Sequence, residues 1–189
     1  MALRTILTAP DPRLKKKSLP VAAVDADVRQ LMDDMLETMY AAPGIGLAAP
    51  QVGVLKRIIV LHIDREDTKV GPLLMANPEI IEASDEDATY EEGCLSVPDH
   101  YSDVVRPARV TVRYLDRDGQ HQELACEGLL ATCVQHEIDH LDGILFIDHI
   151  SALKRNMILR KLLKARKEKA REATEGKPSA KAKEHAPAL

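Results

Sequence analysis

Apolar residues recur with helical spacing in three stretches of this 189-residue chain. The first helix is expected over roughly 25–42, where apolar side chains return every three or four residues and Pro43-Gly44 ends the pattern. The second, from about Leu129 to Leu141, should be buried, because apolar residues cover most of its circumference. The third should begin near Ser151 and continue into the 160s. Its packing face should consist of five apolar residues: Leu153, Met157, Ile158, Leu162 and Leu163.

Strand-like patterns lie between the first two helices. Runs rich in Val, Ile and Leu predict strands at Arg57–Ile63 and around Leu73–Ile81. Two alternating segments, Val110–Tyr114 and His121–Ala125, flank Asp118-Gly119 and predict a β-hairpin. This order of elements indicates an α+β fold rather than alternating βαβ units. We expect antiparallel β-sheets around the buried central helix, plus a C-terminal helix.

Charge is divided unevenly along the chain, although the formal net charge is only −4. Residues 151–189 carry 12 basic and 4 acidic side chains, whereas the other 150 residues carry 14 basic and 26 acidic ones. The acidic run at about 82–92 is expected to be a loop. The basic C-terminal part indicates either a polyanionic partner or a solvated helix end. We expect one domain over 1–172 and a disordered basic tail over 173–189.

The cysteine count and the apolar runs bear on the compartment. Three cysteines, an odd number, argue against a disulfide framework and favour a reducing compartment. No apolar run approaches the roughly 18 residues of a membrane span, and the N-terminus lacks the apolar region of a secretory signal. We therefore expect a soluble cytoplasmic protein with no membrane partner.

The sharpest chemical signal is His136-Glu137-Ile138-Asp139-His140, inside the expected buried helix. Four-residue spacing puts His136 and His140 on one helix face, where both imidazoles can bind one metal ion. Glu137 lies beside the first histidine and can act as a general base toward water. Burying these groups is costly unless they are paired or hold a metal. The pattern therefore favours a metal site over two hydrogen-bonded core histidines.

A third protein ligand is expected upstream of this motif. Downstream, Phe146 stands where an extended metalloprotease motif has a histidine, and the glutamates lie in the polar tail. Cys94 is the best candidate because it lies in a glycine-marked turn, whereas Cys126 and Cys133 are expected to be small core residues. A zinc endopeptidase would need the missing downstream ligand. A structural metal in an RNA-binding protein would need four protein ligands.

A glycine- and alanine-rich segment, Gly44–Gly53, allows another backbone to approach closely. It is either a packing turn or, with a metal nearby, a strand that lines a substrate. Three segments, G-I-G-L-A-A-P-Q (44–51), E-G-C-L-S (92–96) and Q-H-E-I-D-H (135–140), together resemble the three signature motifs of the peptide deformylase family. The resemblance covers roughly residues 4–165.

The resemblance implies a metal-dependent amidohydrolase that removes the N-formyl group from the initiator methionine of nascent polypeptides and releases formate. Three residues would hold one divalent metal ion: Cys94, His136 and His140. The ion is typically Fe²⁺, and Zn²⁺, Ni²⁺ or Co²⁺ can replace it. Glu137 would move the proton from water to the leaving amine. The Leu95 backbone N–H and the Gln51 side-chain amide would hold the tetrahedral oxyanion.

The resemblance also implies substrate contacts and a partner. Gly44 and Gly46 would pair with the peptide as an added strand. Three residues are candidates for the methionine pocket: Ile45, Leu129 and Cys133. The C-terminal helix helps bacterial relatives to dock on the ribosome, so the ribosome is expected as a partner here.

Other residues bear on the surroundings of this site. Arg106 is expected to pair with Glu92 or Asp139, because an unpaired acid near a dry site is costly. Two residues depart from the family pattern. Thr132 stands where relatives often have a larger aliphatic residue, and Tyr101 stands where many have a basic one.

Overall fold

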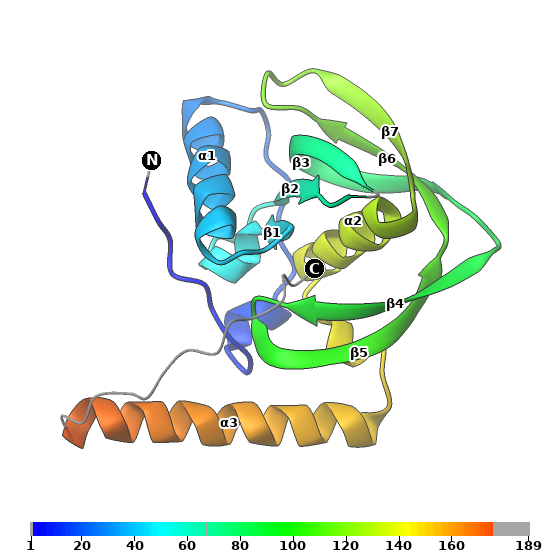
Figure 1. Ribbon diagram of the computed structural model, residues 1–189. Helices are drawn as coiled ribbons and strands as arrows, with labels where there is room; N and C mark the ends of the chain where they lie inside the picture. Colours follow the sequence, from blue (N-terminus) through cyan, green and yellow to red (C-terminus); the bar gives the residue numbers. More distant parts are fainter. Residues whose placement is uncertain (1, 67, 176–189) are drawn as a thin grey trace.

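The computed structural model in Figure 1 describes residues 2–66 and 68–175. Its helices are α1 (Ala26–Ala41), α2 (Gly128–Leu141) and α3 (Ala152–Glu175). Its strands are β1 (Gly46–Ala48), β2 (Ile58–Asp64), β3 (Lys69–Ala83), β4 (Asp87–Cys94), β5 (Val97–Pro107), β6 (Arg109–Leu115) and β7 (His121–Glu127). Short 3-10 helices lie at Pro12–Lys15, Ala49–Val52 and Phe146–Asp148. Among these helices, none is long and apolar enough to cross a lipid bilayer.

All strand pairs between these elements are antiparallel, so the α+β prediction is confirmed. Five strands form a sheet in the order β1-β2-β3-β6-β7, and β4 pairs with β5 in a separate hairpin. The predicted hairpin around Asp118-Gly119 is β6–β7, with Gly119 at a φ of 77°. A positive φ is a conformation that glycine adopts without steric strain.

Helix α2 lies at the centre of the molecule, between the sheet and the β4–β5 hairpin (Figure 1). Most of its residues are buried, as predicted, and its apolar side chains pack with those of β2, β3, β6 and β7. The N-terminal segment covers its C-terminal end, where the Ser18 N–H donates to the Leu141 carbonyl at 2.7 Å. Gly143 follows the helix, and a Cβ there would lie 2.6 Å from the Lys15 carbonyl oxygen. The two-histidine motif is thus on a helix fixed at both its face and its end.

Helix α1 covers a different set of sheet residues. Its methionines Met32, Met35 and Met39 are fully buried and pack in one cluster with apolar residues of β1 and β2. The Asp25 side chain accepts a hydrogen bond from the Val28 N–H, which caps the helix N-terminus. The predicted helix over 25–42 is confirmed.

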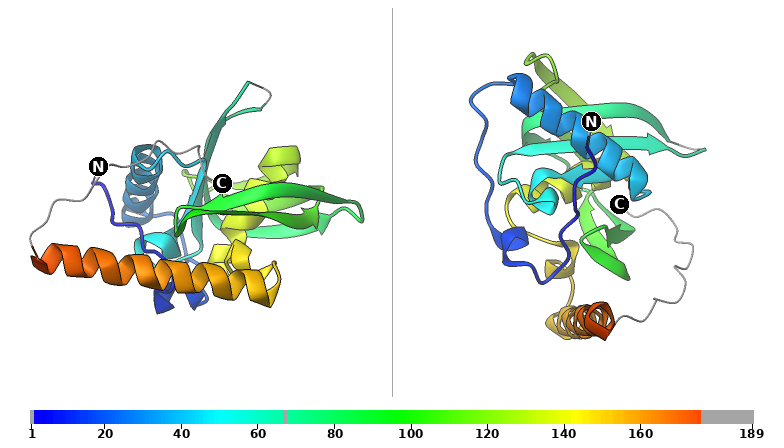
Figure 2. Two further views of the ribbon diagram at one scale, coloured as in Figure 1. Left: turned by 60° about the horizontal axis from the view of Figure 1, so that its bottom comes forward. Right: turned by 90° about the vertical axis from the view of Figure 1, so that its left-hand side faces the viewer.

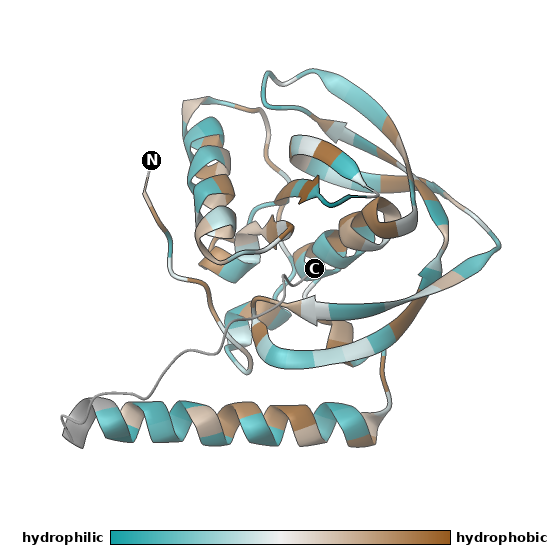
Figure 3. Ribbon diagram, in the orientation of Figure 1, coloured by the Kyte–Doolittle hydropathy of each residue, from teal (hydrophilic) through white to brown (hydrophobic). Residues whose placement is uncertain are grey.

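The acidic loop predicted at 82–92 is wrong. Strand β3 continues to Ala83 and β4 begins at Asp87, so the loop between them is only three residues long. Strand β5, which pairs with β4, was not predicted at all. Exposed residues alternate with buried or half-buried ones along much of β5, and hydrophilic residues make up much of this strand (Figure 3). The buried residues of the hairpin include two charged ones, Glu92 and Arg106. Charges at both exposed and buried positions conceal the alternation that identifies a strand.

Helix α3 is longer than predicted and lies along one side of the molecule (Figure 2). Of its predicted packing residues, Leu162 is buried and Ile158 half-buried in a cluster with the Phe146–Asp148 helix. The prediction is wrong for the other three, which are exposed: Leu153, Met157 and Leu163. Helix α3 therefore packs against the rest of the protein through only a narrow apolar stripe. The disordered tail was expected over 173–189. Helix α3 continues to Glu175, and residues 176–189 lie outside the described residues.

Candidate active site

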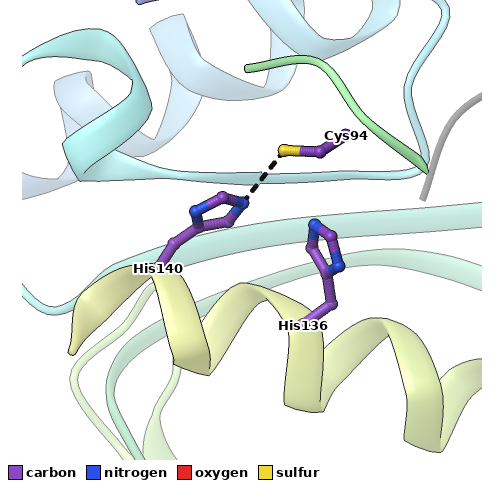
Figure 4. Close-up of side chains that lie close together, drawn as sticks. All are labelled: Cys94, His136 and His140. Carbon is purple, nitrogen blue, oxygen red and sulfur yellow. Dashed lines mark hydrogen bonds between the residues drawn. The ribbon is translucent and has the colours of Figure 1, made fainter. Parts of the chain in front are cut away.

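The three predicted metal ligands meet at one buried point. The ligand atoms of Cys94, His136 and His140 all lie within 4.8 Å of one another, and Cys94 Sγ is 3.2 Å from His140 Nε2 (Figure 4). His136 Nε2 is buried and has no hydrogen-bond partner among the described residues. A buried imidazole nitrogen without a partner fits a metal ligand. A thiolate with two imidazoles suits late first-row divalent metals, and three protein donors leave a position for water or substrate.

Cys94 differs from the other two cysteines in its position. It is the last residue of β4, so the turn predicted around it follows it rather than contains it. The Ser96 N–H points back to its sulfur at 3.4 Å. Cys126 and Cys133 are core residues, as expected. Burial raises the pKa of Cys126 to about 11 and that of Cys133 well above its usual value, so both stay protonated.

A charged network holds the first histidine. Because an ionised carboxylate only accepts hydrogen bonds, His136 Nδ1–H donates to Glu92 Oε2 at 2.8 Å, which leaves Nε2 facing the ligand cluster. Arg106 donates to Glu92 Oε2 at 3.0 Å and to Asp139 Oδ2 at 2.8 Å. The predicted ion pair is confirmed, and it includes both acids. Although burial opposes it, hydrogen bonds from His136 and Arg106 keep the pKa of Glu92 below its usual value.

Glu137 is almost completely buried and lies against β1. Burial raises its pKa to about 7, a value suited to taking up and releasing a proton near neutral pH. Its Oε2 has no hydrogen-bond partner among the described residues. A Cβ at Gly46 would lie 2.3 Å from Glu137 Oε1, so only glycine leaves room for this carboxylate. Burial also lowers the pKa of His140 well below its usual value, which keeps the imidazole neutral as metal binding requires.

Gln51 and Leu95 lie beside the same cluster. The Gln51 side chain accepts a hydrogen bond from the Ala48 N–H at 2.7 Å, and its Nε2 is 3.5 Å from Cys94 Sγ. Leu95 follows Cys94 and is half-buried. A Cβ at Gly44 would lie 2.8 Å from Leu95 Cδ1, so these two predicted residues are in contact.

The three candidates for the methionine pocket share one apolar cluster, in which Ile45 and Cys133 are buried and against which Leu129 packs. Cys133 Sγ lies 3.9 Å from the Ile45 carbonyl oxygen, and both residues are buried in the core. Leu129 is half-buried and also lines a groove of about 1190 Å³, together with Tyr90, Gly93 and Tyr101 of the hairpin. Sequence reasoning missed Tyr90, which belongs to the segment interpreted as a loop.

The comparisons with known proteins agree with this geometry. Residues 3–156 match the family model described as polypeptide deformylase. The chain belongs to the polypeptide deformylase family. It is 58% identical over 175 residues to a peptide deformylase of Methylocella silvestris, covering 91% of this chain and 89% of that one. The deformylase family is metal-dependent, in agreement with the three converging donors.

Solved deformylase structures share the fold. The crystal structure of peptide deformylase from Ehrlichia chaffeensis superposes with a TM-score of 0.85 at 43% identity, covering 89% of this chain and 99% of that chain. A deformylase from Acinetobacter baumannii, crystallised with Met-Ala-Ser bound, has a TM-score of 0.75 at 38% identity and covers 79% of this chain and 99% of that chain.

Proposed function

We propose that this deformylase hydrolyses the N-formyl group of the initiator methionine on nascent polypeptides, with Cys94, His136 and His140 as ligands of one Fe²⁺ ion that Zn²⁺, Ni²⁺ or Co²⁺ can replace. The observation that carries the proposal is the convergence of these three donors beside the buried Glu137. When bound, the metal ion supplies Lewis acidity, which lowers the pKa of water and polarises a carbonyl group.

The residues around the ligands transfer the proton and stabilise the oxyanion. Glu137 takes a proton from the attacking water as the new C–O bond forms at the formyl carbon. It delivers that proton to the amine nitrogen as the C–N bond breaks, so the products are formate and a free amine. The Gln51 amide and the Leu95 N–H donate hydrogen bonds to the oxyanion that develops between these steps.

The peptide is held mainly through its backbone. Gly44 and Gly46 pair with the substrate as with an added strand, which recognises main chain and tolerates many sequences. Ile45, Cys133 and Leu129 surround the methionine side chain. The Met-Ala-Ser bound to the relative from Acinetobacter baumannii has the form of a deformylated product and supports this assignment.

Replacing the general base tests the mechanism. Glu137→Gln should retain one metal ion per chain but lose on the order of 10²–10⁴ in formate release from a formyl-Met peptide, because an amide cannot accept the proton. Glu123→Gln, at an exposed glutamate on β7, is the control and should have normal activity. Near-normal formate release by Glu137→Gln would contradict the role. Cleavage at an internal peptide bond without formate would indicate an endopeptidase instead.

We also propose that α3 docks on the ribosome through RNA phosphates and that the enzyme acts in the cytoplasm, where nascent chains emerge. The helix carries a dense set of exposed cations: Lys154, Arg160, Lys161, Lys164, Arg166, Lys167 and Lys169. Such contacts release counterions, so the affinity should fall steeply with salt.

The docking test should leave α3 in place, because the buried Leu162 shares a cluster with Cys94. Replacing Lys161, Lys164 and Lys167 together with Gln should weaken ribosome binding and flatten its salt dependence, with little effect on a short formyl peptide. The matched control replaces Lys16, Lys17 and Lys69. Equal binding by both triple variants would leave α3 with only a packing role.

A further inference from the structure

The Gln51 side-chain amide is held at both ends. The Ala48 N–H donates to its Oε1 at 2.7 Å. Because an N–H needs an acceptor, this bond determines the orientation of the amide. Its Nε2 therefore faces the ligand cluster, donating one N–H to Ser96 Oγ at 3.1 Å. The other N–H is directed at Cys94 Sγ over 3.5 Å, a long contact that a substrate oxygen can replace.

Ser96 is itself fixed by its surroundings. It is fully buried, and its carbonyl accepts a hydrogen bond from the Ala9 N–H at 2.8 Å. Two residues before Ala9, the Leu7 N–H donates to the Gln51 carbonyl at 2.7 Å. One short N-terminal segment thus ties together the backbones of Gln51 and Ser96, which are far apart in sequence. This segment fixes the relative positions of the two backbones from which the hydroxyl and the amide project.

We propose that Ser96 is a positioning residue for the reaction: its hydroxyl accepts one Nε2–H of Gln51 and so directs the other toward the oxyanion. This inference rests on the proposed function, in which Gln51 is an oxyanion donor. A donor stabilises the transition state in proportion to how well it is oriented before the reaction. Without the hydroxyl, a buried N–H of Gln51 loses its partner, and the amide turns toward other acceptors.

A double-mutant cycle with Gln51 tests the coupling. Ser96→Ala should lower kcat roughly 10- to 100-fold with little change in KM, a smaller loss than the roughly 10²–10³ expected for Gln51→Ala. The double variant should be no slower than Gln51→Ala, because Ser96 acts only through that amide. Ser18→Ala is the matched control, since Ser18 Oγ is buried without a partner among the described residues. It should keep normal kcat.

Two further readouts do not depend on turnover. Metal content should remain one ion per chain in Ser96→Ala. The ¹⁵N resonance of the Gln51 side-chain amide should shift in Ser96→Ala and not in Ser18→Ala. If Ser96→Ala does not fold, Ser96→Thr and Ser96→Val form a pair that differs only in the hydroxyl, and the threonine variant should retain at least 10-fold more kcat.

Three results would overturn the inference: kcat of metal-loaded Ser96→Ala within twofold of the parent, a double variant whose losses multiply, or equal kcat for Ser96→Thr and Ser96→Val. These outcomes leave the proposed function intact as long as the parent releases formate from a formyl-Met peptide. Absence of formate from the metal-loaded parent would instead contradict the proposed function.

Discussion

The β4–β5 and β6–β7 hairpins each carry an Arg–Glu ion pair, and the two pairs differ sharply in exposure. In β4–β5 the Arg106 and Glu92 side chains are 6% and 0% exposed, whereas in β6–β7 those of Arg113 and Glu123 are 51% and 55% exposed. The buried pair has further partners, because Glu92 also holds His136 and Arg106 also holds Asp139. The exposed pair simply joins two residues that lie opposite each other in the ladder.

The difference shows how each hairpin is attached to the central helix. Val110, Val112 and Cys126 attach β6–β7 to α2 through apolar contacts, which depend on area and not on direction. Charges attach β4–β5 to α2, and they set the orientation of His136, a proposed metal ligand. A buried ion pair gains little net stability over apolar packing, since both charges must be desolvated. Its value here is the geometry it gives to the site.

Removing a cysteine from each hairpin should give the largest contrast. Cys94→Ala should lose most of the bound metal and, with it, activity, because only two of the three proposed donors, both imidazoles, would remain. Cys126→Ala, in β7, should keep one metal ion per chain and lose only the stability that a small buried side chain contributes. Metal analysis of both variants beside their formate release separates these outcomes. If Cys126→Ala lost its metal and Cys94→Ala kept it, the ligand assignment would be wrong.

The two arginines offer the next contrast, in stability. Arg106→Ala removes the arginine shared by two acids, one of them fully buried, and should cost about 3–5 kcal/mol of the free energy of unfolding. Arg113→Ala removes an exposed pair and should cost less than about 1 kcal/mol. Urea unfolding of the metal-free proteins measures both differences. Similar losses would mean that the buried network is no more important to the fold than the surface pair.

The same contrast between hairpins shows what could be predicted from the sequence. For β6–β7 the signals are local: alternating residues on both sides of Asp118-Gly119 identify the hairpin and its turn. For β4–β5 the signals are not local. Glu92 can be buried in a strand only because Arg106, 14 residues later, pairs with it. The shared buried position of His136 and His140 could be predicted, since two histidines one turn apart on a buried helix are costly unless they are paired or bind a metal. The contact between Gln51 and Ser96 could not be predicted, because it depends on where the N-terminal segment crosses the two sequence motifs that contain these residues.

The smallest expected effect concerns the turn that made β6–β7 predictable. Gly119 has a φ of 77°, and Asp116 Oδ1 accepts hydrogen bonds from the N–H groups of Asp118 and Gln120 beside it. Gly119→Ala should cost about 1 kcal/mol, because a Cβ is strained at positive φ, although the nearest heavy atom to that Cβ would be 3.8 Å away on Val24. In a chain of this size that corresponds to a decrease of about 2–4 °C in Tm. Metal content and kcat should stay unchanged, since β6–β7 contributes no ligand. If metal affinity fell together with Tm, the two hairpins would be coupled through α2 more tightly than their separate attachments imply.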